Sequence, residues 1–172
     1  MQEYPVNLKI DYPESSDRLT AVFRLILVIP IVIILALIST YAEALSFAIA
    51  MMILFKEKYP KWWFDWNIGI TKFAYRIVAY VFLMRDEYPS TDDDQSVHLT
   101  IPYPDVKQDL KRWMPLVKWI LVIPHIIALI IIFIGVVLGT IFALIAILFT
   151  GKYPIAIFRF NEGFLRWSLR VS

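Results

Sequence analysis

The chain offers few residues that could perform chemistry, and they are scattered along it. Glu43 is the only charged residue between Leu25 and Phe55. An ionisable group inside a membrane segment is a candidate for a proton or ion role. We interpret Glu43 instead as a solvated turn residue. The two histidines, His98 and His125, have no neighbours in the sequence that would supply the three or four ligands of a zinc site.

No other motif points to catalysis. The acidic run at residues 92–94 lacks the spacing and the glycine of an EF-hand loop, and we interpret it as solvated. Phosphate-binding, hydrolase, zinc-protease and dinucleotide fingerprints are missing from the sequence. Cysteine is also missing, which excludes disulfides and thiolate chemistry. The sequence therefore predicts a non-enzymatic protein with no catalytic residue, no metal site and no cofactor.

Two copies of one unit account for most of the chain. Short blocks recur at an offset of 94 residues, since 124 − 30 = 94 for the prolines of Leu-Val-Ile-Pro and 154 − 60 = 94 for those of Lys-Tyr-Pro. The same offset aligns Asn67 with Asn161. A strand-like block ending in Tyr-Pro opens each copy. Residues shared by both copies are expected to serve the common fold.

The composition indicates a membrane environment. Hydrophobic residues make up 59% of the chain, whereas soluble domains have about 45–50%. The windows 25–55 and 119–151 contain no Lys or Arg. As single helices they would be about 46–50 Å long, which exceeds a hydrocarbon core of about 30 Å. We therefore predict a helical hairpin in each window, with turns at Ser39–Glu43 and Gly135–Gly139. The second leg of each either spans or is re-entrant.

Local patterns predict the elements around each hairpin. Apolar residues alternate with polar ones at 6–11 and again at 97–101, which is typical of short half-buried strands. These strands are expected to pair with each other or to pack on the helices; an unpartnered extended arm is the alternative. Pro30 and Pro124 lie within the first legs and should kink them.

A charged stripe marks the segment that follows each hairpin. At 100° per residue the charged side chains of 61–76 fall within about 60°, and those of 159–170 within about 80°. Aromatic and aliphatic residues cover the rest, as in a helix that lies in the membrane interface. Packing of that face on the hairpin is the alternative. We predict lipid binding, with anionic headgroups as partners, by Lys61, Trp62, Trp63, Trp66, Lys72, Arg76, Arg159, Arg166 and Arg170.

The sequence also predicts boundaries and orientation. Residues 1–84 form the first membrane repeat, 85–96 an acidic polar linker, and 97–172 the second repeat. The second copy stops where the first is still helical, so we expect the natural chain to continue beyond Ser172. No secretory signal is recognisable at the start. Both predicted turns lack Lys and Arg, so the termini and linker are expected on the cytoplasmic side of a plasma membrane.

The ordered blocks carry a resemblance over nearly the whole chain. Tyr-Pro after a strand, Leu-Val-Ile-Pro, Lys-Tyr-Pro, Phe-x-x-Asn-x-Gly and a downstream Arg occur in both copies. Together they resemble an uncharacterised prokaryotic membrane-protein family that is known only by a domain-of-unknown-function label. The resemblance implies an integral membrane protein with no assigned activity, and we expect it in the prokaryotic inner membrane. It supplies no catalytic residues.

These observations predict an all-α membrane protein of two tandem repeats. Each repeat has a short β-strand, a proline-kinked hydrophobic helical hairpin and an amphipathic interfacial helix. The expected function is a lipid-engaging scaffold or an accessory subunit of a larger membrane complex, formed with other subunits or with itself. The alternative is a small transporter or channel, either monomeric or oligomeric. Glu43 and His125 would be its polar anchors.

Overall fold

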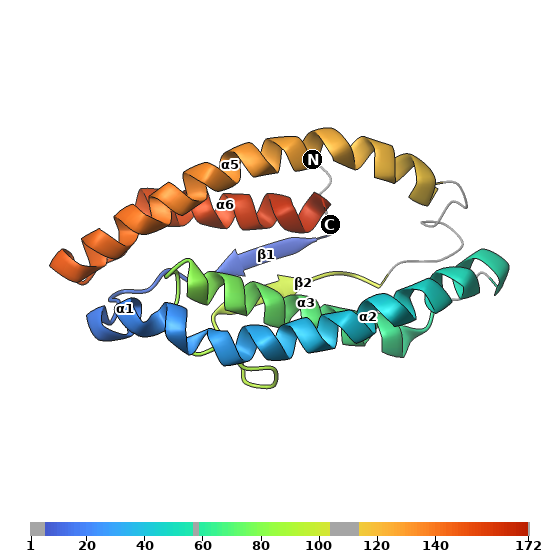
Figure 1. Ribbon diagram of the computed structural model, residues 1–172, viewed down its shortest axis with the longest axis horizontal. Coiled ribbons are helices and arrows are strands. Elements are labelled where there is room, and N and C mark those ends of the chain that lie inside the picture. The colour runs from blue at the N-terminus through green and yellow to red at the C-terminus, as the bar shows by residue number, and fades with distance from the viewer. Residues whose placement is uncertain (1–5, 57–58, 104–113, 172) are drawn as a thin grey trace.

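The computed structural model is mostly helical and describes residues 6–56, 59–103 and 114–171. Two strands each precede a set of helices along the chain. Figure 1 shows the two strands in the middle, an inner helix beside each strand, and the longest helices along the two outer flanks. The elements are β1 (Asn7–Ile10), α1 (Arg18–Leu27), α2 (Ile29–Lys56), α3 (Lys61–Val81), β2 (Val97–Thr100), α5 (Met114–Thr150) and α6 (Ile155–Val171).

The two predicted strands pair with each other, which was one of the two arrangements expected for them. They form an antiparallel two-stranded sheet in which Leu8 faces Leu99 and Lys9 faces His98. Alternation decides which side chains are buried: Leu8 and Ile10 are buried, whereas Lys9 is exposed. The ribbon buries its apolar face on helices, because β1 packs against α6 and β2 against α3.

A bend separates α1 from α2 next to Pro30. The axes of Arg18–Leu27 and Ile29–Ala42 differ by 41°, which confirms the predicted kink at this proline. At Pro124, in contrast, α5 continues as one unbroken helix.

The predicted hairpins are wrong. Residues 39–43 lie inside α2 and residues 135–139 inside α5, so neither range forms a turn. Thr40 is accommodated because its Oγ1 donates to the Ala36 carbonyl oxygen of the preceding turn, at 2.9 Å. Gly135 and Gly139 serve packing: a Cβ there would lie 3.4 Å from Phe160 and 3.2 Å from Ile157 of α6.

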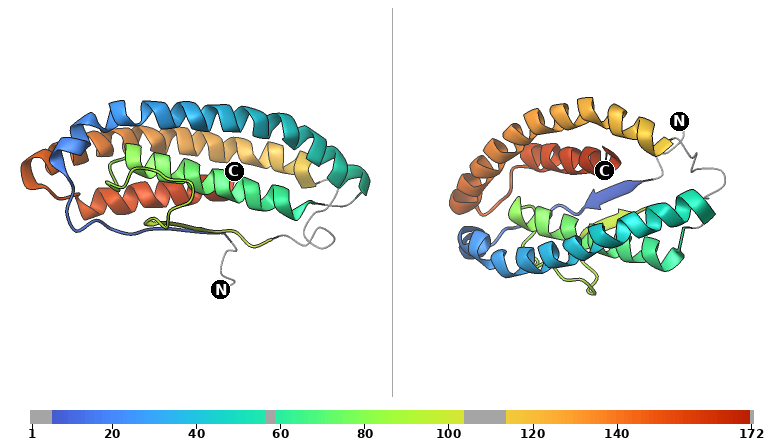
Figure 2. Two further views of the ribbon diagram at one scale, coloured as in Figure 1. Left: turned by 90° about the horizontal axis from the view of Figure 1, so that it is seen from below. Right: turned by 45° about the vertical axis from the view of Figure 1, so that its right-hand side comes forward.

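The elements stack in three layers. Figure 2 shows α1, α2 and α5 along one face, α3 and α6 beneath them, and the strands on the opposite side. Pro60 and Pro154 immediately precede α3 and α6, where a missing N–H costs nothing. The two amphipathic helices are thus confirmed as helices, and they form the middle layer.

Aromatic contacts cross between the N-terminal and C-terminal halves in both directions. Tyr12 follows β1, yet its ring meets Phe158 of α6 edge-on, with centroids 5.1 Å apart. Tyr103 follows β2, yet its ring meets Phe64 of α3 at 5.0 Å. The hydroxyl of Tyr103 also donates to the Tyr59 carbonyl oxygen at 2.5 Å. Each strand therefore packs against the other half of the chain.

A buried polar cluster joins the halves around Tyr153. Its hydroxyl donates to the Phe82 carbonyl oxygen at 3.1 Å and accepts from Asn161 Nδ2 at 3.0 Å. Asn161 Nδ2 also lies 3.3 Å from Thr140 Oγ1 of α5. Burial raises the pKa of Tyr153 well above its ordinary value, against a smaller opposite effect of the Asn161 hydrogen bond. The hydroxyl therefore stays protonated and available as a donor.

Linker residues 85–96 are held against the ribbon. Arg85 donates to the Asp11 carbonyl oxygen and pairs with Glu87. The Glu87 carboxylate in turn accepts from the Ser96 hydroxyl at 2.5 Å and the Ser96 N–H at 3.1 Å. The linker thus fixes the start of β2.

Replacing Tyr153 by Phe should destabilise the fold. The change leaves the Phe82 carbonyl and the Asn161 amide without their buried partner, which costs about 1–3 kcal/mol. Denaturant unfolding in detergent, followed by circular dichroism, measures this. The control is Tyr41→Phe, at a position 70% exposed. Equal stabilities of the two variants would contradict the role given to Tyr153.

Glu87 should make stability depend on pH. Burial raises its pKa, but the Ser96 and Arg85 hydrogen bonds lower it by more, so it lies below the ordinary 4.5. The stabilisation is therefore complete above 4.5 and is lost as pH falls through the lowered pKa. Between about pH 5.5 and pH 3 the wild-type melting temperature should fall further than that of Glu87→Gln. Glu14→Gln, at an exposed carboxylate, should behave like wild type; identical pH profiles for all three would refute this assignment.

Candidate lipid-facing surface and polar groove

The nine residues predicted to bind lipid do not share one environment. Lys61, Trp62 and Trp66 of α3 are exposed, as are Arg159 and Arg170 of α6. Lys72 and Arg166 are half-buried, whereas Trp63 and Arg76 are buried. The structure therefore leaves a candidate set at the surface and removes two members from it.

Arg76 is a structural residue. Its guanidinium donates to the Ser90 carbonyl oxygen at 2.5 Å and to the Asp93 carbonyl oxygen at 2.8 Å. Only 4% of the residue is exposed, so it cannot reach a headgroup in this fold. The charged stripe of α3 misled the prediction because the linker folds back over its last cation.

Trp63 is likewise inside the protein. Its ring lies between those of Trp62, at 5.8 Å, and Trp66, at 5.1 Å. Of the three tryptophans, Trp62 is the most exposed, at 62%. Trp62 and Trp66 remain as residues suited to the headgroup level of a membrane.

Arg24 is a buried arginine that the sequence reasoning did not single out. It donates to the Arg85 carbonyl oxygen at 3.0 Å, pairs with Asp86, and lies 4.7 Å above the Tyr80 ring. The one sequence feature that could have marked Arg24 is its position at the edge of a long apolar window. A cation there must either reach water or find partners, and Arg24 finds them in the linker.

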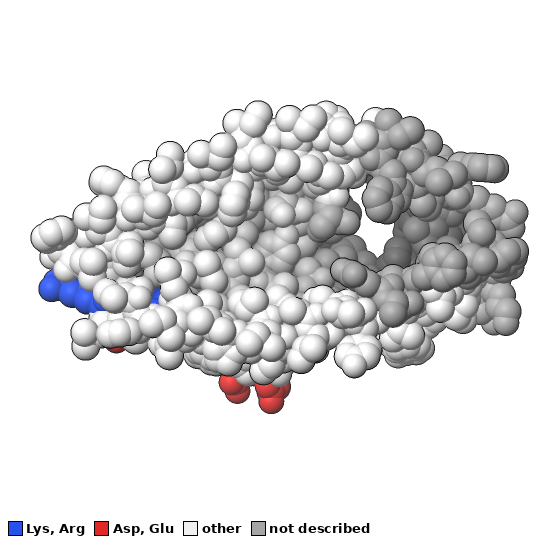
Figure 3. Space-filling view, viewed as in Figure 1, with Lys and Arg blue, Asp and Glu red and all other residues white. Residues whose placement is uncertain are grey.

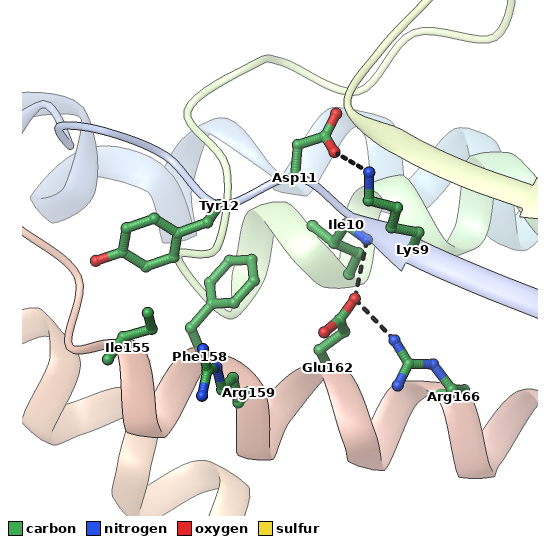
Figure 4. A pocket seen from close by; sticks show the side chains of 9 residues that line it. All are labelled: Lys9, Ile10, Asp11, Tyr12, Ile155, Phe158, Arg159, Glu162 and Arg166. Carbon is green, nitrogen blue, oxygen red and sulfur yellow. Dashed lines mark hydrogen bonds and ion pairs between the residues drawn. The ribbon is translucent and has the colours of Figure 1, made fainter.

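A polar groove of about 520 Å³ lies between β1 and α6 (Figure 4). Glu162 accepts from the Ile10 N–H at 3.1 Å and pairs with Arg166 at 3.0 Å. Arg166 Nε donates to the Leu8 carbonyl oxygen at 3.1 Å. Two of the charged groups of α6 thus complete the backbone hydrogen bonding of β1. The groove is lined by Lys9, Ile10, Asp11, Tyr12, Ile155, Phe158, Arg159, Glu162 and Arg166.

The remaining charges of the groove are more exposed. Asp11 pairs with Lys9 at 3.3 Å and contacts His98 Nε2 at 3.0 Å. The His98 hydrogen bond is the main reason that the pKa of Asp11 lies below its ordinary value. Arg159 makes no ion pair with any residue that the structure describes. Arg159 is therefore the cation of this groove that can meet an external anion.

The layer formed by α1, α2 and α5, opposite the strands, is apolar. Exposed apolar side chains follow α1, α2 and α5, and a second groove of about 340 Å³ lies between α1 and α5. Figure 3 views this layer, and in the part that the structure describes charge shows only as blue at one end and red at one edge. The second groove is lined by Ala21, Val22, Leu25, Val81, Phe82, Leu83, Phe133, Val137, Thr140, Ile141 and Leu144.

The other candidate residues do not converge. His125 is exposed on α5, and its Nδ1 hydrogen-bonds the Leu121 carbonyl oxygen of its own helix at 3.1 Å. His98 is on β2. The side chain of Glu43 lies outside the described residues. Among the residues that are described, no three His, Asp or Glu side chains gather where they could hold a metal ion.

The described chain is a mostly helical protein with helix length and composition suited to a membrane. The segment Leu121–Thr150 of α5 contains an 18-residue window with a mean hydropathy of 3.1 and could cross a bilayer. The bent pair Arg18–Leu27 and Ile29–Ala42 would be a second candidate if it counts as one span. These judgements rest on length and composition.

Comparison with known families finds one match. The model of the family described as "Domain of unknown function (DUF4389)" matches residues 18–91. The predicted resemblance to a family known only by such a label is therefore confirmed for this segment. Neither the curated proteins nor the solved structures yield a match.

Arg76 and Lys72 should respond differently to removal of charge. Arg76→Gln removes two charge-assisted bonds to the linker, each worth about 1.5–3 kcal/mol, and should lower stability markedly. Lys72→Gln, one turn earlier on α3 and half-buried, should change the free energy of unfolding by about 0.5 kcal/mol or less. Detergent unfolding curves measure both. An Arg76→Gln variant as stable as Lys72→Gln would show that the linker does not depend on Arg76.

Proposed function

We propose that this protein is a lipid-engaging, non-enzymatic membrane protein that acts as a scaffold or as an accessory subunit of a membrane complex. One observation carries the proposal. In the most apolar window of α5 only 11% of residues are buried within the fold. The core helix of a soluble protein would be mostly buried, so this helix needs another apolar environment. Acyl chains supply it.

Residues at the ends and edges of the apolar layer support lipid contact. Lys61 and Trp62 are adjacent and exposed at the start of α3, and Arg159 is exposed on α6. An aromatic ring beside a cation is suited to the headgroup region. A cation near an anionic surface contributes about 1 kcal/mol. Anionic headgroups are therefore the proposed ligands of these residues.

We also propose that the two halves are tandem structural repeats. Both halves follow the order strand, long apolar helix, amphipathic helix. The contact of Tyr12 with Phe158 has its counterpart in that of Tyr103 with Phe64. This correspondence between the two halves supports the proposed repeat. The proposed location is a prokaryotic plasma membrane, with the linker on the cytoplasmic side.

Native mass spectrometry from mild detergent tests the proposal. The full chain is reconstituted with equal amounts of phosphatidylglycerol and phosphatidylcholine, extracted, and scored for retained lipid. Lys61→Gln should lower the phosphatidylglycerol preference about fivefold, the equivalent of about 1 kcal/mol. Lys9→Gln is the matched control, because Lys9 is an exposed lysine on the strand side and should leave the preference nearly unchanged.

Two results would count against the proposal. Wild-type protein that retains no lipid and co-purifies with no membrane partner would remove both the lipid-engaging and the scaffold functions. Equal loss of preference in the Lys61 and Lys9 variants would show that the effect is one of net charge alone. Folding of each variant is checked beforehand by its melting temperature.

A further inference from the structure

The middle of α5 lies level with the polar contacts between α6 and β1. Gly135 of α5 meets Phe160 of α6, and Phe133 meets Phe164 with ring centroids 5.9 Å apart. Glu162, between those two phenylalanines in the sequence, accepts from the Ile10 N–H of β1. Residue 135 is also near the centre of the apolar segment Leu121–Thr150. The ribbon and its ion pairs therefore lie beside the centre of this segment.

This arrangement conflicts with an α5 that crosses the bilayer. Centring its apolar segment in the hydrocarbon would place Glu162 and Arg166 near the midplane, where a charge costs about 2.5–3.5 kcal/mol or more. It would also place there the outer edge of β2, which pairs with no further strand among the described residues. Open strand edges do not occur in contact with lipid, because their N–H and C=O groups have no partner.

The three layers are compatible with another position of the protein, along the membrane surface. Long apolar helices form one face and the ribbon lies on the opposite side (Figure 2). In the part of the apolar face that the structure describes, charge shows only at one end and at one edge (Figure 3). The segment Leu121–Thr150 contains 30 residues, or about 45 Å of helix, against a hydrocarbon core of about 30 Å. A helix that lies flat has no such mismatch.

We propose that the chain rests in one leaflet, with α1, α2 and α5 parallel to the membrane plane and the β1–β2 ribbon toward water. The inference rests on the proposed lipid engagement and specifies how the protein meets the bilayer. The apolar layer contacts acyl chains, α3 and α6 lie nearer the headgroups, and the linker is in the aqueous phase. The described faces match this order of polarity.

A scan of depth along α5 distinguishes lying flat from crossing. The chain has no cysteine, so single cysteines carry a nitroxide without further changes. One stripe of exposed residues runs along the helix, opposite the buried Val136, Ala143 and Ile147. The stripe positions to label are Ile123, Ile127, Ile130, Ile134, Leu138, Ile141 and Ile145. Oxygen and a water-soluble nickel chelate, compared in phosphatidylglycerol–phosphatidylcholine vesicles, report the depth of each label.

Lying flat predicts one common depth along the stripe, about 5–10 Å below the headgroup boundary. Crossing predicts a maximum near Ile134, about 15 Å deep, with shallower values toward Ile123 and Ile145. That second profile would overturn the inference while leaving lipid engagement intact. Labels that meet no lipid at any position would instead overturn the proposed function.

Labels on the ribbon supply the independent check. Lys9→Cys and His98→Cys are exposed positions and should be reached by the nickel chelate as readily as a free nitroxide in water. Protection of both labels from the chelate would contradict the proposed position even if the stripe gave one depth. Melting temperatures within a few degrees of wild type confirm that each labelled variant is folded.

Discussion

The antiparallel pairing of β1 with β2 is the interaction on which the rest of the arrangement depends. A two-stranded ribbon alone is marginal in water. Here each strand gains an apolar floor from a helix, β1 on α6 and β2 on α3. Tyr12 and Tyr103 then carry the chain beyond each strand onto the other half. The strand pairing therefore holds the two halves together, along with the buried cluster around Tyr153.

Two buried arginines hold the linker against the helices. Arg24 and Arg76 are almost fully buried, yet both bind groups of the 85–96 linker. Removing a guanidinium from water is costly unless hydrogen bonds replace the lost hydration. The linker carbonyls provide those bonds and are thereby fixed beside the ribbon. The apolar helices are left to cover the other face, so the protein acquires two chemically different sides.

Local patterns predicted the strands and the amphipathic helices, but neither the unbroken long helices nor most of the tertiary partners. Alternation at 6–11 and 97–101 predicted the strands, and their pairing followed one of the expected arrangements. Charge periodicity predicted helices at α3 and α6, and Pro30 predicted the bend. Arg76 could not be assigned in this way, because its linker partners, the carbonyls of Ser90 and Asp93, are 14 and 17 residues away. Trp63 looked equivalent to Trp62 until packing separated them.

The hairpin prediction was wrong for a related physical reason. Threonine indicates a turn because its hydroxyl can compete with a helix for local hydrogen bonds, and glycine indicates one because it adopts backbone conformations that other residues avoid. In α2, Thr40 satisfies its hydroxyl within the helix. In α5, Gly135 and Gly139 are sites where α6 approaches closely. Lengths of 28 and 37 residues for α2 and α5 exceed a simple span, and that excess is consistent with helices that lie along a membrane surface.

The sidedness of the two ends of the molecule tests the account most directly. The start of α3 and the end of α5 lie toward opposite ends of the long axis (Figure 1). Lys61 is the first residue of α3, and Lys152 follows the last residue of α5 by two positions. Single cysteines at these positions are treated with a membrane-impermeant maleimide in sealed vesicles of uniform orientation. If the long helices lie flat, both cysteines react from the same side. Reaction of one from outside and of the other only after the vesicles are opened would show that the long helices cross the bilayer.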